Sequence, residues 1–333
     1  MEKKWFIGID ISKSTLDVVI YDPSKKKADS ENYKLVTNNE EGYSALRRWF
    51  KENDLRVVDT VVCLEHTGLY GFDLRLYLEQ HKIDYAAFHP LHLKRSLGLV
   101  RGKNDKVDAQ RIAYFGYLHR DELHYSQLAG STILRLQELC CERKRYVKHL
   151  AETKSYLTEM KTRKQDSSYV RAQNMLKMLE EDIKTVEKEM LELVENDEAI
   201  RHNYTLLLSI KGIGHVNAIN TIIHTDNFNA FENARQYACY LGVAPFEHTS
   251  GTSVRGKTRV SKTGAKLLKA DLTQAARSAI VCDKEMKDYY LRKTEEGKMH
   301  GTVMNAVKFK LVGRMFAVIK RGTPFVNLMN YKN

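Results

Sequence analysis

The sequence lacks long apolar runs, paired cysteine motifs and an apolar leader. No apolar run approaches the roughly 18 residues needed to cross a bilayer, and MEKKWFIGID passes from charged residues straight into a strand pattern without a cleavage site. The five cysteines are odd in number and none has C-x-x-C spacing, which argues against a disulfide framework or a zinc ribbon. We therefore expect a cytoplasmic, soluble protein with reduced thiols. Its 333 residues suffice for two or three domains.

Glycine and proline are absent from residues 131–200, where the apolar residues take up helical spacing. One register contains Leu139, Tyr146, Leu150, Leu157 and Met160, and a second contains Leu176, Leu179, Ile183, Val186, Met190 and Leu193. The polar stretch 162–168 separates the two registers. This pattern predicts a coiled-coil helical hairpin over 131–200, which could pack on itself or on a second copy of the chain.

Residues 1–130 alternate strand and helix patterns. Residues 5–9 and 16–21 resemble strands, followed by a turn at Asp22-Pro23, and 85–88 resembles another. The continuous apolar run 57–64 is typical of a strand buried on both faces, and 69–81 has a helical pattern. The sequence predicts an α/β domain here.

The excess of positive charge is confined to residues 201–333, which hold 21 Lys and Arg against 9 Asp and Glu. Such an uneven distribution favours a polyanionic partner, and nucleic acid in particular. Within this part, SIKGIGHVNAINTII has the form of a helix-hairpin-helix element. Gly212 and Gly214 would let a helix N-terminus approach a phosphate. An ordinary helix-helix turn fits the same glycines equally well.

Four acidic residues stand where their side chains could meet. Asp10 follows the first strand in GIDISK and Glu65 ends the strand in VVCLEHTG, so both lie at carboxyl ends of strands. Asp105 and Asp108, in RGKNDKVDAQRIAYF, share one face at the start of a helix. Carboxylates without His or Cys partners favour Mg²⁺ or Mn²⁺. Two such ions would support in-line phosphodiester chemistry.

Each acid also has a purely structural interpretation. Asp105 could cap the helix and Asp108 could sit favourably in its first turn. Asp10 could cap a turn, and Glu65 could be a solvated strand end. The conjunction of two strand-end acids with a helical acid pair flanked by Arg101, Lys103 and Lys106 favours the metal site. Asp17, Asp22 and Asp59 are left out of it.

The stretch from Ser250 to Ala270 contains six basic residues and no acid. Its glycines predict a loop, followed by a helix, and its charge predicts phosphate binding. Ser250, Ser253 and Ser261 offer candidate nucleophilic hydroxyls, although turn chemistry alone explains a serine beside glycine. The residues predicted to contact nucleic acid are Lys13, Arg101, Lys103, Lys106, Gly212, Gly214, Arg255, Lys257, Arg259, Lys262 and Lys266.

Together these motifs resemble the DEDD-type transposases of the insertion-sequence-110 family, which are related to Piv DNA invertases. The resemblance is carried by GIDISK, LEHTGLYG, KNDKVDAQRIA, LLLSIKGIG, YLGVAPFEHTSG and VSKTGAKLLKADL. It implies a RuvC-like ribonuclease H fold over 1–130, a coiled coil over 131–200 and a mainly helical transposase domain over 201–333. It further implies that Asp10, Glu65, Asp105 and Asp108 bind metal, and that Ser250, which precedes Gly251, is the nucleophile.

The resemblance also implies partners: target and donor DNA, a structured guide RNA encoded by the element, and further copies of the chain in a dimer or tetramer. The expected activity is therefore site-specific DNA recombination through a phosphoserine ester. The main alternative is a Mg²⁺-dependent RuvC-like nuclease that uses water as its nucleophile. A sugar-kinase-like ATPase and a noncatalytic nucleic-acid scaffold are weaker alternatives, because LEHTGLYG is a poor phosphate loop and the acids would then have no role.

Overall fold

The computed structural model describes residues 3–22, 32–65, 68–88, 90, 93, 104–164, 166–250, 254–260 and 264–326. The chain divides into two compact units, Met1–Leu128 and Ala129–Asn333. Each unit has its own buried apolar core. Within the described ranges, no helix is both long and apolar enough to cross a membrane.

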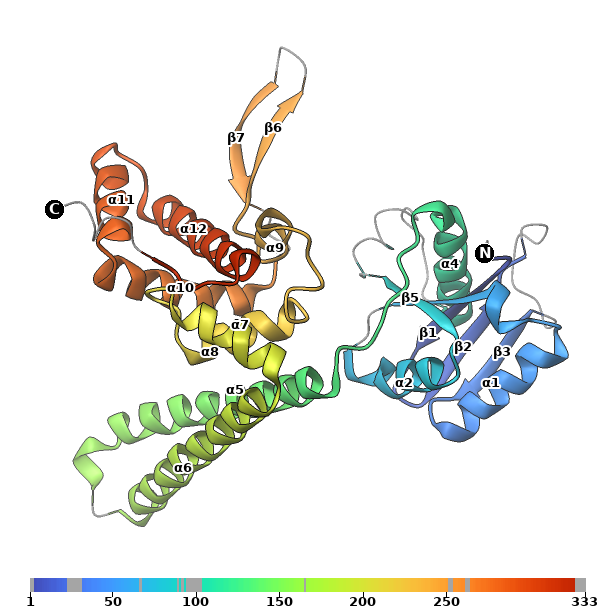
Figure 1. The fold of residues 1–333 in the computed structure, drawn as a ribbon. Coiled ribbons are helices and arrows are strands. Elements are labelled where there is room, and N and C mark those ends of the chain that lie inside the picture. Colours follow the sequence, from blue (N-terminus) through green and yellow to red (C-terminus); the bar gives the residue numbers. More distant parts are fainter. Residues whose placement is uncertain are drawn as a thin grey trace. The chain divides into compact units, whose positions relative to one another are not determined.

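The first unit is built on a five-stranded mixed sheet with the order β3-β2-β1-β4-β5. β1 pairs antiparallel with β2 and parallel with β4, while β2–β3 is antiparallel and β4–β5 is parallel. The strands are β1 Trp5–Ile11, β2 Thr15–Ile20, β3 Tyr33–Thr37, β4 Thr60–Glu65 and β5 Asp84–Phe88. The helices are α1 Glu40–Glu52, α2 Phe72–Gln80 and α4 Asp105–Leu118, with short 3-10 helices at Val57–Asp59, Gly68–Gly71 and Arg120–Glu122 (Figure 1).

The predicted α/β character of this part is confirmed, but its elements differ in detail. The strand expected to start at Val57 begins at Thr60, because Val57–Asp59 forms a 3-10 helix in which the Asp59 N–H donates to the Arg56 carbonyl at 3.0 Å. The side chains of Arg56 and Asp59 also pair. β3 and α1 were not predicted. The expected turn at Asp22-Pro23 extends beyond the described residues.

The second unit begins with the hairpin of α5 (Ser131–Glu159) and α6 (Ser167–Asn196), joined through a 3-10 turn at Lys161–Arg163. Leu179, Val186 and Met190 of the predicted apolar register are buried. The first register is interrupted at Arg143, whose Nε donates to Glu187 across the hairpin at 2.7 Å. An ion pair therefore fills the gap in the apolar seam, and the two helices pack on each other.

The rest of the second unit is mainly helical, as expected. Its core includes Leu207, Ile222, Ala276, Leu311 and Val312, which are all fully buried. The helices are α7 Glu198–Leu208, α8 His215–His224, α9 Ala234–Tyr240, α10 Lys266–Cys282, α11 Lys284–Glu295 and α12 His300–Arg321. Between α9 and α10 lie the strands β6 Pro245–Ser250 and β7 Val254–Val260.

The first part of the basic segment was predicted to be a loop, and this prediction is wrong for Val254–Val260, which form a strand. β6 and β7 form an antiparallel hairpin in which Pro245 pairs with Val260 and Ser250 pairs with Val254. In Figure 1 this hairpin extends away from the helices of its own unit. The β-branched residues of β7, Val254, Thr258 and Val260, favour extended backbone in spite of Gly256 between them.

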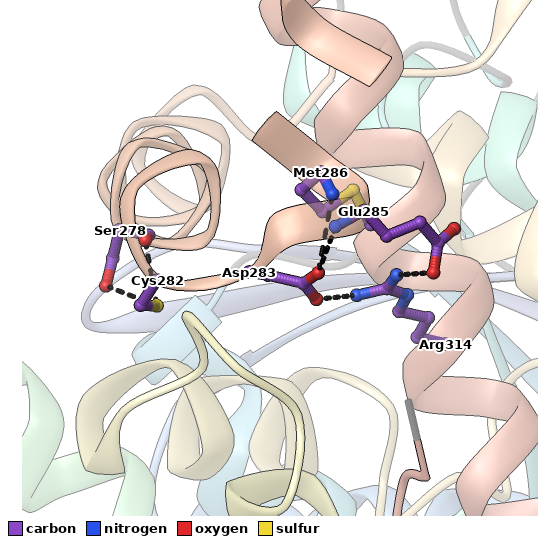
Figure 2. Close-up of polar contacts among 6 residues, drawn as sticks. All are labelled: Ser278, Cys282, Asp283, Glu285, Met286 and Arg314. Carbon is purple, nitrogen blue, oxygen red and sulfur yellow. Dashed lines mark hydrogen bonds and ion pairs between the residues drawn. The ribbon is translucent and has the colours of Figure 1, made fainter. Parts of the chain in front are cut away.

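A buried ion pair fixes the corner between α10 and α11 (Figure 2). Asp283 is fully buried and caps α11 by accepting hydrogen bonds from the N–H groups of Glu285 and Met286. Arg314 of α12 donates to Asp283 and to Glu285, at 2.6 Å in each case. Since a lone buried carboxylate is costly, Arg314 couples the start of α11 to α12.

Candidate active site

Asp10 and Glu65 lie side by side at the carboxyl ends of β1 and β4. These strands are parallel and paired up to Ile9 and Leu64, and each acid is the next residue of its strand. Both are half-buried. The expectation that these two strand ends would bring their acids together therefore agrees with the register of the sheet.

Asp105 and Asp108 occupy the first turn of α4. Asn104 caps this helix, since its side-chain oxygen accepts from the Lys106 N–H at 3.1 Å. The N-cap of α4 is therefore Asn104, and Asp105, which could have been the cap, is the first residue of the helix. Asp108 approaches Arg111 at 3.5 Å, a long contact that leaves its charge only partly balanced.

α4 lies against β1 because small residues line the contact. A Cβ built on Gly8 would lie 1.9 Å from the carbonyl oxygen of Ala109 and 2.8 Å from the Ala113 Cβ. One built on Gly116 would lie 2.3 Å from the Cys63 Sγ. Because the backbones of α4 and β1 are in direct contact, the first turn of α4 lies near the end of β1 that contains Asp10.

The electrostatics of Asp10 show that these acids act on one another. The pKa of Asp10 is raised from 3.8 to about 6, chiefly by burial. Repulsion adds to the shift, in decreasing order, from Asp105, Asp108, Asp17 and Glu65. The four predicted acids thus share one electrostatic environment, and a fifth acid belongs to it.

That fifth acid, Asp17, was left out of the predicted metal site, but it lies close enough to Asp10 to affect its pKa. It is the antiparallel partner of Asp10 and is 7% exposed. Its carboxylate accepts a hydrogen bond from the Tyr33 hydroxyl at 2.7 Å, and the Lys106 ammonium lies 4.5 Å from the centre of the Tyr33 ring. The available signal was the tight turn at residues 12–14, which places Asp10 opposite Asp17 once the hairpin register is drawn.

The chemistry of this cluster fits a divalent cation. Carboxylate oxygens are the ligands that Mg²⁺ and Mn²⁺ prefer, and a cation would relieve the repulsion acting on Asp10. Nevertheless, within the described part of the chain no three acidic, histidine or cysteine side chains are close enough together to hold one ion. Metal binding would therefore draw the carboxylates closer than they are here.

Ser250 lies in the second unit, as the last residue of β6. Arg255, Lys257 and Arg259 lie on β7. For these three residues and for Ser250 the structure describes the backbone only. Lys13 and Lys266 are exposed, whereas Lys106 is half-buried. The remaining predicted residues, Arg101, Lys103, Ser253, Ser261 and Lys262, fall outside the described residues.

The two glycines predicted to approach phosphate differ from each other. Gly212 has φ of +95°, and a Cβ there would lie 2.7 Å from the Ala275 carbonyl of α10. Its contact with α10 supplies a packing reason for glycine. Gly214 is exposed, precedes α8 and has open space around its Cβ position. Only Gly214 retains the free approach that a phosphate contact requires.

Comparisons with known proteins cover both units. A DEDD-type model described as "Transposase" matches residues 7–162, and a model described as "Transposase IS116/IS110/IS902 family" matches residues 204–291. The pilin gene-inverting proteins of Moraxella bovis and Moraxella lacunata are each 25% identical over 97% of this chain and 98% of their own length. A probable family 20 transposase of Pseudomonas aeruginosa is 30% identical over 32% of this chain and 30% of its own length.

These matches define the class of protein: an enzyme of the transposase and DNA invertase type, with a DEDD-type first domain. More particularly, the chain belongs to the IS110 family of transposases and is related to the pilin gene-inverting proteins. Membership implies action on DNA and, for the DEDD-type domain, use of divalent metal.

Proposed function

We propose that the protein is a site-specific DNA recombinase of a bacterial insertion sequence, in which Asp10, Glu65, Asp105 and Asp108 hold two Mg²⁺ or Mn²⁺ ions and Ser250 is the nucleophile. The observation that carries the proposal is the convergence of acids from β1, β4 and α4: the pKa of Asp10 is raised to about 6, chiefly by burial and further by repulsion from Asp105, Asp108 and Glu65. Asp17 lies in the same environment and adds to the negative charge.

In the proposed reaction the Ser250 oxygen attacks a phosphodiester phosphorus. An Oγ–P bond forms, the P–O3′ bond breaks, the serine proton is released and the leaving 3′ oxygen takes up a proton. The product is a 5′-phosphoserine, and the reverse reaction with another 3′ hydroxyl rejoins DNA without ATP. Bound divalent cations would supply activation of the hydroxyl and neutralise charge on the leaving oxygen.

A nicked DNA substrate whose small cleaved fragment dissociates would trap this intermediate. We expect a protein–DNA adduct that survives denaturation, is lost in Ser250→Ala and in Asp10→Asn, and persists in Ser253→Ala and Ser261→Ala. Retention of the adduct in Ser250→Ala with its loss in Ser253→Ala would transfer the role to Ser253.

The alternative is a RuvC-like nuclease that uses water. It is favoured by one observation: all the clustered acids belong to the first unit, which has its own core. This alternative expects free 5′-phosphate ends and no adduct in the same trapping experiment.

The proposal extends to a structured guide RNA and to a dimer or tetramer with shared active sites. The basic excess of residues 201–333 supports nucleic-acid binding of either kind. Purification from cells that also express the neighbouring noncoding DNA should yield one specific transcript, whereas bulk cellular RNA would oppose guidance. Mixing Ser250→Ala chains with Asp10→Asn chains should restore adduct formation if sites are shared, and should not if each chain acts alone.

A further inference from the structure

The β6–β7 hairpin, which carries Ser250, joins the helices of the second unit at a short root. We define the root as residues 240–245 on the entering side and Gly264 and Ala265 on the leaving side. Ser250 is at the far end of β6, six residues along from Pro245 inclusive. At about 3.3 Å per residue, the serine backbone stands roughly 17 Å from the root. Any tilt at the root is therefore magnified at Ser250.

The backbone of the root is tightly bonded. The N–H groups of Val243 and Ala244 both donate to the Ala238 carbonyl, at 2.9 and 3.1 Å, and both residues are fully buried. On the leaving side the Ala265 N–H donates to the Tyr240 carbonyl at 3.0 Å. These bonds fix the backbone just before β6 and at the start of α10, and they leave the carbonyls of Gly242 and Val243 for other donors.

Glycine allows the two sides of the root to touch. A Cβ on Gly264 would lie 2.5 Å from the backbone nitrogen of Gly242. A side chain at residue 264 would therefore force the leaving side of the root away from the entering side. The direction of the hairpin depends on this backbone contact and on the groups that bind the Gly242 backbone.

Two side chains from distant helices hold consecutive carbonyls of the entering side. Lys269 of α10 donates from Nζ to the Gly242 carbonyl at 2.6 Å. Asn305 of α12 donates from Nδ2 to the Val243 carbonyl at 2.8 Å. The root is thereby tied to α10 and α12 as well as to its own backbone.

The surroundings of Lys269 show what its ammonium does. Lys308 is 6% exposed and donates to the Thr273 hydroxyl at 3.1 Å, and that hydroxyl donates to the Lys269 carbonyl at 2.7 Å. Neither lysine forms an ion pair with any acid of the described chain. Burial lowers the pKa of both lysines. A lysine ammonium that is partly buried without an acidic partner costs folding stability. The hydrogen bond of Lys269 to the Gly242 carbonyl of the root offsets part of that cost.

We propose that Lys269 and Asn305 are positioning residues that fix the direction of the β6–β7 hairpin and so place Ser250 for attack. This inference rests on the proposed function, because it gives Ser250 a reaction to perform. A displacement of 1 Å in a reacting group can cost about 100-fold in rate. A small tilt at the root would produce that displacement at the end of β6.

The test uses the full chain with the variants Lys269→Met and Asn305→Ala. We expect adduct formation at saturating DNA to slow by about 10- to 100-fold, with DNA affinity unchanged and faster hydrogen exchange at the amides of Val243, Ala244 and Ala265. Lys269→Arg keeps a donor of similar reach and should recover most of the rate. Lys287→Met removes an exposed lysine of α11 and should change none of these quantities.

The outcomes separate the two proposals. Normal adduct formation and normal exchange in Lys269→Met would overturn the positioning role and leave the serine mechanism standing. Weakened DNA affinity with a normal rate at saturating DNA would make Lys269 a DNA contact instead. If the unsubstituted chain forms no adduct, the serine mechanism fails and takes the positioning role with it, while unchanged exchange in the variants would separately refute the anchor.

Discussion

Gly8 of β1 and Ala109 of α4 are in backbone contact, so close that a methyl group on Gly8 would overlap the Ala109 carbonyl. Asp10 follows Gly8 by two residues, and Asp105 and Asp108 precede Ala109 on the same helix. The packing of α4 on the sheet and the convergence of the acids are therefore one structural feature. A change that lifts the helix should disturb both.

Gly8→Ala should destabilise the first unit. The overlap is with backbone, which cannot rotate away, so the cost should reach about 3 kcal/mol, the upper end of ordinary overpacking. Both tryptophans, Trp5 and Trp49, belong to the first unit, and their fluorescence during urea unfolding reports on it alone. A Gly8→Ala protein with the same unfolding midpoint as the unsubstituted chain would contradict the contact.

Asp10→Asn should stabilise the metal-free first unit at neutral pH. The pKa of Asp10 is raised from 3.8 to about 6, so its ionisation costs stability as the pH rises through 6, and none is lost below 3.8. Because Asp10 is partly exposed, solvent screening reduces the gain to about 1 kcal/mol at pH 7.5. Tryptophan fluorescence should show the gain shrinking from pH 7 to pH 4. Asp54→Asn, on an exposed acid, should show no such trend.

The sequence predicted the acids at the strand ends because that argument needs only strand direction. Asp10 is the last residue but one of β1 and Glu65 the last residue of β4, and the parallel pairing of these strands was enough to bring them together. Predicting that Asp17 lies beside Asp10 requires the register of the β1–β2 hairpin, and the alternation of apolar and polar residues does not give that register. β6 and β7 were missed because glycines were weighed above the β-branched residues between them.

Packing contacts were beyond the sequence for a different reason. Lys269 bonds Gly242 across 27 residues, and Asn305 bonds Val243 across 62 residues. No periodicity links such pairs, and a lysine within a basic run is expected to face solvent or phosphate. The contact of Gly8 with α4 could not be predicted either. A glycine in a strand indicates that another backbone approaches closely, but it does not indicate which one.

Arg314→Met should strongly destabilise the second unit. It would remove the Arg314 cation from the Asp283 carboxylate, which is fully buried. Removal of one partner of a buried pair costs about 3–5 kcal/mol. Adding Asp283→Asn to Arg314→Met should recover part of the loss, because the amide keeps an oxygen for the α11 cap and carries no charge. Helical circular dichroism during urea unfolding measures both, with Arg277→Met on exposed α10 surface as the control.

His224 should make the second unit acid-labile. Burial, assisted by repulsion from Lys144, lowers its pKa from 6.5 to about 4, and its Nδ1 lies 3.3 Å from the Tyr240 hydroxyl. A histidine held neutral contributes stability above pH 6.5 that is lost as the pH falls towards 4. His224→Gln should flatten this part of the stability profile, as measured by helical circular dichroism. An unchanged acid slope in the variant would show that other groups cause it.

Divalent cations should stabilise the first unit through the clustered acids. A ligand that binds only the folded state at about 100 times its Kd adds roughly 2.7 kcal/mol. Titration with Mn²⁺ should therefore raise the unfolding midpoint followed by Trp5 and Trp49 fluorescence. Asp10→Asn and Glu65→Gln should each lose most of this increase, while Asp54→Asn should retain it. Equal stabilisation of all four proteins would mean that the ion binds elsewhere, and the proposed metal site would then be wrong.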